Sequence, residues 1–135
     1  LKPYLYAAML NDGYILPQTL VPDVPTQISG YSPQNFNLTY DGAVLASRAL
    51  ARSLNIPSVL MLQDYSVNQF YEKLQQLKLR NVNRQPSNYG LSLILGGAES
   101  NLWDLCKAYA YMSSTLTYFN QNDAKYRKNE MQNLN

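Results

Sequence analysis

Apolar residues recur at helical spacing at the start of this chain, and turn signals then divide the chain into short segments. The apolar positions among the first ten residues include Leu1, Leu5, Ala8 and Met9. Residues three and four apart share one face of a helix, so this pattern predicts a helix over residues 1–10. Gly13 should end that helix, because glycine readily adopts the left-handed conformation found at helix ends.

Two helices are predicted around a break near residue 54. Asp41 is a favourable N-cap, and it predicts a helix over residues 43–52. Pro57 fits the start of a second short helix over residues 57–63. The residue before a proline is pushed out of helical geometry, so residues 53–55 should lie in the break.

Two more helices are predicted further along. Ser66 and Gln69 have the spacing of a capping box for a helix that runs to about residue 79. Asn101 is expected to cap another helix, in which Cys106 would be a buried core thiol. The apolar face of that helix is predicted to contain Leu102, Leu105, Cys106, Tyr109 and Met112.

The remaining segments read as loops and short extended pieces. Three prolines within residues 14–28 forbid a long helix and predict an extended connector, which can hold a short strand. Residues 90–95 are either a short strand or a single buried turn. The sequence thus predicts a mainly α fold with few short β segments. Residues 1–119 would form one domain, and residues 120–135 a polar tail that extends as helix or is disordered.

Charge and composition exclude several functions. The chain has 135 residues, with 11 Lys and Arg against 9 Asp and Glu, and a net charge of +2 is too weak to indicate nucleic-acid binding. It has one cysteine and no histidine, which excludes an internal disulfide, Ser-His-Asp catalysis and most zinc sites. No run approaches the ~20 apolar residues that cross a bilayer. Any base must therefore be a lysine or a carboxylate.

Ser53 and Asn55 are the first candidates for chemistry. A hydroxyl and a carboxamide two residues apart, in a break between helices, can both face one cleft. The alternative is that both side chains cap helix ends, as these residue types commonly do.

Five short motifs lie in a fixed order along the chain. Lys2 precedes a proline, and Tyr31, Pro33 and Asn35 follow a Tyr-x-Pro-x-Asn pattern. Residues 53–55 read Ser-Leu-Asn, residues 95–99 read Leu-Gly-Gly-Ala-Glu, and residues 102–105 read Leu-Trp-Asp-Leu. In this order and spacing, the motifs resemble the transpeptidase domain of class A penicillin-binding proteins, the 1C type in particular. The resemblance covers residues 1–111.

The resemblance implies a fold and a position within a longer protein. The chain would be the helical subdomain of the serine penicillin-binding and β-lactamase-like transpeptidase fold. The central sheet and the Lys-Thr-Gly strand would lie outside it. In the family motif Ser-x-x-Lys, the nucleophilic serine stands three residues before the lysine, and so upstream of Leu1. The chain alone is therefore expected to be inactive.

The resemblance also implies roles for five residues. Lys2 would act as the base, which requires a neutral amine. Ser53 would relay a proton between the lysine, the nucleophile and the leaving amine, and Asn55 would hydrogen-bond the amide of the substrate. Tyr31 and Asn35 would shape the cleft wall and contribute to substrate binding. For Asn35, hydrogen bonds that stabilise its own loop are an equal alternative.

The parent protein implied by the resemblance is an acyltransferase of cell-wall (peptidoglycan) biosynthesis. It would cross-link stem peptides through an acyl-serine intermediate and be acylated by β-lactam antibiotics, and the resemblance implies no metal or organic cofactor. It would be anchored in the inner membrane, face the periplasm and carry an upstream glycosyltransferase domain. The alternatives are a non-catalytic helical module that binds peptides or other proteins, and a degenerate homologue that binds cell-wall peptide without turnover.

Overall fold

The computed structural model describes residues 1–128, which form two compact units. The first unit contains Leu1–Tyr71 and Arg84–Ala98. The second contains Glu72–Asn83 and the residues from Glu99 onward. Each unit is described by itself.

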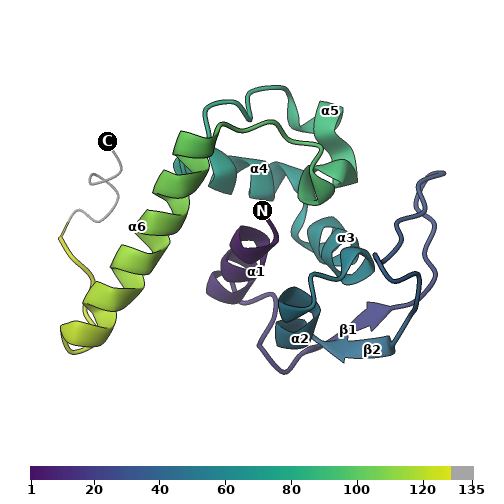
Figure 1. Ribbon diagram of the computed structural model, residues 1–135, viewed down its shortest axis with the longest axis horizontal. Helices are drawn as coiled ribbons and strands as arrows, with labels where there is room; N and C mark the ends of the chain where they lie inside the picture. Colours follow the sequence, from purple (N-terminus) through teal and green to yellow (C-terminus); the bar gives the residue numbers. More distant parts are fainter. Residues whose placement is uncertain (129–135) are drawn as a thin grey trace. The chain divides into compact units, whose positions relative to one another are not determined.

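The described residues are mainly helical (Figure 1). The α-helices are α1 (Lys2–Asn11), α2 (Ala46–Ala51), α3 (Asn55–Tyr65), α4 (Val67–Gln76), α5 (Pro86–Tyr89) and α6 (Leu102–Gln121). A 3-10 helix, η1 (Gly90–Leu95), follows α5 directly. One antiparallel pair of strands, β1 (Leu20–Asp23) and β2 (Gly42–Leu45), completes the described elements. None of the helices in residues 1–128 combines the length and the hydropathy needed to cross a bilayer.

Helix α3 is the centre of the first unit. It contacts α1, α2, β1 and η1, and Figure 1 shows α1 and α2 beside it. Its side chains at Ile56, Val59, Leu62 and Tyr65 are fully buried. The Tyr65 hydroxyl donates a hydrogen bond of 2.6 Å to Asp12 at the end of α1. Both burial and this bond therefore hold α1 against α3.

The start of α2 differs from the predicted helix over residues 43–52. The segment Gly42–Leu45 pairs with β1 instead, and α2 begins at Ala46. Asp41 does not cap α2; its carboxylate forms an ion pair with Arg52. The prediction was wrong because it used local preferences, which a strand partner some twenty residues away overrides.

Helix α3 begins two residues earlier than predicted. Asn55 is its first residue, so only Ser53 and Leu54 lie in the break after α2 and its C-cap. Pro57 falls in the first turn of α3, where the missing N–H costs nothing because the first N–H groups of a helix have no partner within it.

The Gly-Gly bend after η1 has a steric reason. Gly96 adopts a left-handed φ of +99° at the end of η1. A Cβ on Gly97 would lie 2.4 Å from Ser92 Oγ and 2.8 Å from the Ser92 carbonyl oxygen. Of the two readings for residues 90–95, the structure shows the buried turn, since η1 is a 3-10 helix with Leu93 and Ile94 buried.

Helix α4 follows the predicted signals and ends three residues before the predicted position. The Ser66 hydroxyl accepts a hydrogen bond of 3.2 Å from the Gln69 amide, which is the first half of a capping box. Phe70 and Leu74 of this helix are fully buried. The helix ends at Gln76.

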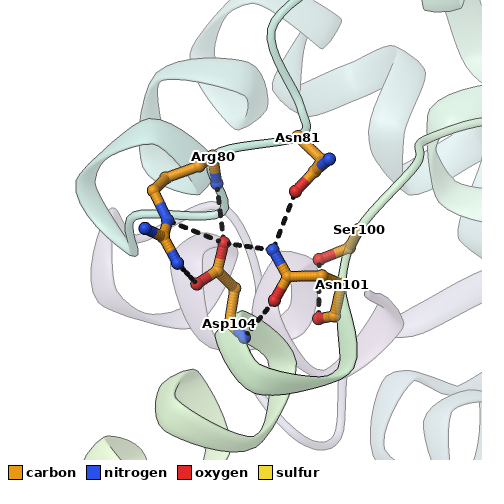
Figure 2. A network of polar contacts seen from close by, with 5 residues as sticks. All are labelled: Arg80, Asn81, Ser100, Asn101 and Asp104. Carbon is orange, nitrogen blue, oxygen red and sulfur yellow. Dashed lines mark hydrogen bonds and ion pairs between the residues drawn. The ribbon is translucent and has the colours of Figure 1, made fainter.

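A polar network organises the second unit around Asp104 (Figure 2). The Asn101 side chain caps α6 by accepting from the Asp104 amide at 2.8 Å, as predicted. The Asp104 carboxylate, 3% exposed, accepts hydrogen bonds from the Arg80 amide and guanidinium. Asn101 also donates to Asn81 at 2.8 Å. The Arg80 guanidinium is the main reason that the pKa of Asp104 is lowered to about 2.

This network explains why the predicted apolar face of α6 was wrong. The buried residues of α6 are Asp104 and Ala108, which lie four apart on one face. Leu102 is 77% exposed, and Cys106 is an exposed free thiol rather than a buried one. Asp104, on the covered side of α6, forms an ion pair with Arg80, 24 residues earlier. A helical pattern alone does not contain that partner.

Helix α6 continues to Gln121, into the first residues of the predicted tail. The predicted boundary at residue 120 stays a prediction. The part of the tail from residue 129 onward lies outside the described residues.

Candidate functional site

Three polar side chains from distant parts of the chain meet at one place in the first unit. The Lys2 amine donates to Asn55 Oδ1 at 2.7 Å and to Ser53 Oγ at 3.0 Å. It also donates to the Ser53 carbonyl oxygen at 2.9 Å. An ammonium group has three N–H donors, so these acceptors match its full capacity. We call Lys2, Ser53 and Asn55 the amine cluster.

Helix α1 places Lys2 in the cluster. Lys2 is the first residue of α1, and Pro3 follows in the first turn, where a proline is tolerated. Leu5 and Met9 are 1% exposed and anchor the helix in the core of the first unit. Since α1 contacts both α2 and α3, its first turn lies close to the break between those two helices.

Ser53 has a left-handed backbone, with φ of +53°. Its amide donates to the Leu50 carbonyl at 2.9 Å, and the Leu54 amide donates to the Ala49 carbonyl at 3.0 Å. These bonds close the end of α2, and Leu54 is buried beneath the turn at 5% exposure. In this conformation, both the carbonyl oxygen and the hydroxyl of Ser53 lie within hydrogen-bond distance of the Lys2 amine.

Asn55 is oriented by contacts at both ends of its carboxamide. Its Oδ1 accepts from Lys2, and its Nδ2 donates to the Gln34 carbonyl at 2.9 Å. The capping alternative is not what the structure shows, because the N-cap of α3 is Leu54 and no side chain at that position caps the helix. Instead, Asn35 Oδ1 accepts from the amides of Asn55 and Ile56 at 3.0 and 3.2 Å.

Partial burial changes the acidity of the cluster. The loss of solvent around Lys2 lowers the pKa of its amine below the usual 10.5. Burial disfavours the charged form, so a larger share of Lys2 is neutral at a given pH than for an exposed lysine. A neutral amine has a lone pair and can accept a proton from a neighbouring hydroxyl.

The structure does not bring Tyr31 to the amine cluster. Tyr31 forms an antiparallel bridge with Ile28, with reciprocal N–H···O bonds of 2.8 Å. Its side chain lines a cavity of about 390 Å³, and no member of the amine cluster lines that cavity. The full lining is Ile28, Ser29, Tyr31, Tyr89, Leu91 and Ser92.

Asn35 is 2% exposed, and its carboxamide is bonded within the protein. Its Nδ2 donates to Asp23 Oδ1 at 2.6 Å and to the Thr39 carbonyl at 3.0 Å. These contacts favour the second of the two predicted roles, the stabilisation of its own loop. Sequence reasoning missed Asp23, which lies in a proline-containing stretch where nothing marks a buried carboxylate.

The cluster offers no metal site. Within residues 1–128, no three His, Cys, Asp or Glu side chains gather as metal ligands would. The chemistry available here is therefore that of an amine, a hydroxyl and a carboxamide.

Comparison with known proteins identifies the relatives of this chain. No protein-family model matches it. Penicillin-binding protein 1C of Escherichia coli (strain K12) is 40% identical over 109 residues, which are 81% of this chain. The crystal structure of penicillin-binding protein 1A from Haemophilus influenzae matches 81% of the chain with a TM-score of 0.68 and 28% identity. This chain is a relative of the class A penicillin-binding proteins.

A second penicillin-binding protein structure supports the fold. PonA1 from Mycobacterium tuberculosis matches 84% of the chain with a TM-score of 0.72, at 18% identity. The predicted class, a mainly helical subdomain of a penicillin-binding protein, is therefore confirmed. The chain spans 14% of penicillin-binding protein 1C, 16% of the 1A structure and 32% of the PonA1 structure.

Proposed function

We propose that this chain carries the lysine and the Ser-x-Asn segment of a peptidoglycan D,D-transpeptidase. The observation that supports this most is the convergence of the Lys2 amine on Ser53 and Asn55, from positions more than fifty residues away. The relation to penicillin-binding proteins supports the same assignment. The nucleophilic serine and the oxyanion donors would come from outside this chain, which is inactive alone because other contacts cannot replace them.

In the proposed reaction, the neutral Lys2 amine takes the proton of the nucleophilic serine as its oxygen attacks the penultimate D-Ala carbonyl. The tetrahedral intermediate collapses when the C–N bond breaks. Ser53, 3.0 Å from the amine, passes the proton to the departing D-Ala amine. An amine of a second stem peptide then attacks the acyl-serine, and its proton returns through the same groups. A β-lactam would acylate the same serine.

Asn55 has capacity left for a substrate. Each carboxamide has two N–H donors and two oxygen lone pairs. The contacts with Lys2 and Gln34 use one of each. The second N–H and the second lone pair can bind the backbone amide of a stem peptide. For Tyr31, the proposed substrate contact would be made from its cavity rather than from the cluster.

The proposal extends to the setting of the parent protein. It would be anchored in the inner membrane, work at the periplasmic face and carry a glycosyltransferase domain upstream. It needs no cofactor, because the amine, hydroxyl and carboxamide supply the proton transfers.

The test is covalent labelling of the intact protein that contains this chain with a fluorescent penicillin. Lys2→Arg keeps a long cationic side chain but stays charged, so acylation should slow by roughly 10² to 10⁴-fold, the worth of a general base. Ser53→Ala should slow it by about 10²-fold. Ser47→Ala, an exposed serine on α2, is the matched control and should label normally.

Two results would contradict the proposal. The first is labelling of Lys2→Arg at the wild-type rate. The second is a folded wild-type protein that takes no label at any pH, which would favour the non-catalytic peptide-binding module.

A further inference from the structure

We infer that Asn35, held by the buried carboxylate of Asp23, is a positioning residue for the amine cluster. It acts through the start of α3, which it fixes by two main-chain bonds. The inference rests on the proposed function. The loop before β2 thereby holds Asn55 and Ser53 close to Lys2.

Helix α3 depends on an external cap. The first N–H groups of a helix have no partner within the helix, and a capping side chain usually satisfies one of them. At α3 the N-cap is Leu54, which cannot do so. Asn35 Oδ1 accepts from Asn55 and Ile56, at 3.0 and 3.2 Å, from a loop some twenty residues earlier.

This cap acts on a residue of the amine cluster directly. The same residue, Asn55, gives its main-chain N–H to Asn35 and its side-chain oxygen to Lys2. The neighbouring carbonyl of Gln34 accepts from Asn55 Nδ2. The Gln34–Asn35 segment therefore holds both the backbone and the carboxamide of Asn55, and a shift of this loop would move the acceptor away from the amine.

Asp23 decides which way the Asn35 carboxamide faces. Asp23 Oδ1 accepts from Asn35 Nδ2 at 2.6 Å, so Asn35 Oδ1 must point toward α3. Asp23 Oδ2 accepts from the Asp41 amide at 2.9 Å, which ties the carboxylate to the residue before β2. Asp23 is 1% exposed, and a buried carboxylate bonded on both oxygens has little freedom to turn.

The test compares variants by two measurements that do not depend on one another. Hydrogen exchange of the Asn55 and Ile56 amides reports the cap itself. The rate of acylation by a fluorescent penicillin, followed against pH, reports the chemistry. Asn35→Ala removes the cap, and Asn88→Ala is the control, since Asn88 is an exposed asparagine on α5.

In Asn35→Ala, both amides should exchange about tenfold faster or more, the size expected when a hydrogen bond is lost. Acylation of the folded protein should slow by about tenfold or more. The acid limb of its pH profile should move to higher pH, because a less enclosed Lys2 has a pKa nearer its usual value. Asn88→Ala should leave all three unchanged.

A charge-neutral swap covers the case in which Asn35→Ala does not fold. In the double variant Asp23→Asn with Asn35→Asp, residue 23 donates and residue 35 still accepts from α3, while the bond of residue 35 to the Thr39 carbonyl is lost. Each single variant should lose the cap, whereas the swap should restore slow exchange and much of the acylation rate. A swap that restores neither contradicts the inference.

The outcomes separate this inference from the proposed function. A wild-type protein that is folded but not labelled contradicts the proposed function. Unchanged exchange at Asn55 and Ile56 in Asn35→Ala contradicts the inference. Faster exchange with an unchanged acylation rate and pH profile also contradicts it, because Asn35 would then be a structural cap only.

Discussion

Ser53 allows the chemistry of its hydroxyl to be separated from the strain of its backbone. Its φ of +53° lies in the left-handed region, which destabilises the folded state by roughly 1–2 kcal/mol for a residue with a Cβ. Ser53→Ala keeps that cost and loses the hydroxyl that accepts from Lys2. Ser53→Gly loses the same hydroxyl but relieves the backbone.

The two variants should therefore differ in stability and agree in activity. Replacing alanine by glycine removes about 1–2 kcal/mol of backbone strain from the folded state. It also destabilises the fold by about 0.5–1 kcal/mol, because the unfolded chain has more conformational freedom at glycine. Ser53→Gly should thus be more stable than Ser53→Ala by about 1 kcal/mol. Both should show the same loss of acylation, about 10²-fold, because both lack the proton relay.

Urea unfolding of the two purified variants measures the difference in the free energy of unfolding, and fluorescent penicillin labelling measures the rate. Equal stability of the two variants would refute the backbone argument. Wild-type acylation in Ser53→Gly would refute the relay, since that variant has no hydroxyl at this position.

Three further predictions test other parts of the account. Gly97→Ala should destabilise the protein by about 1–3 kcal/mol in urea unfolding, because the new Cβ meets the backbone of Ser92; an unchanged midpoint would contradict the tight bend. Asp104 has a pKa lowered to about 2, so its ion pair with Arg80 should contribute stability above about pH 4 that is lost as pH falls toward 2. Between about pH 4 and pH 2, the urea midpoint of Asp104→Asn should fall less than that of the wild-type protein. An equal fall in both proteins would count against the ion pair. Cys106 should react with a maleimide in the folded protein. A thiol that reacts only after denaturation would show that Cys106 is buried and would contradict the exposed position.

Local patterns predicted the elements whose signals lie within one segment. The spacing of Leu5 and Met9 predicts α1, and the Ser66 capping signal predicts α4, because the cause lies within one turn of the effect. The predicted start of α2 was wrong because Gly42–Leu45 pairs with a strand that lies outside the local sequence. The prediction of the buried face of α6 was wrong for the same reason, since Arg80, the partner of Asp104, is distant in sequence.

The candidate site divides in a similar way. Propensity and spacing did not decide whether Ser53 and Asn55 cap helix ends or take part in catalysis. The resemblance was the basis for placing them with Lys2, and the structure brings these three side chains within hydrogen-bond distance. The supporting pair of Asp23 and Asn35 could not be predicted as a pair, because their contact depends on how the β1 strand and the following loop fold together.

The most direct measurement of the central claim is a pH titration of the Lys2 side chain by NMR in the protein that contains this chain. The account predicts that the pKa of the Lys2 amine lies below the usual 10.5 and that the side-chain amide signals of Asn55 shift with the same midpoint. A midpoint at 10.5, with Asn55 signals that do not respond to it, would show that the amine stands apart from the cluster and would contradict the account.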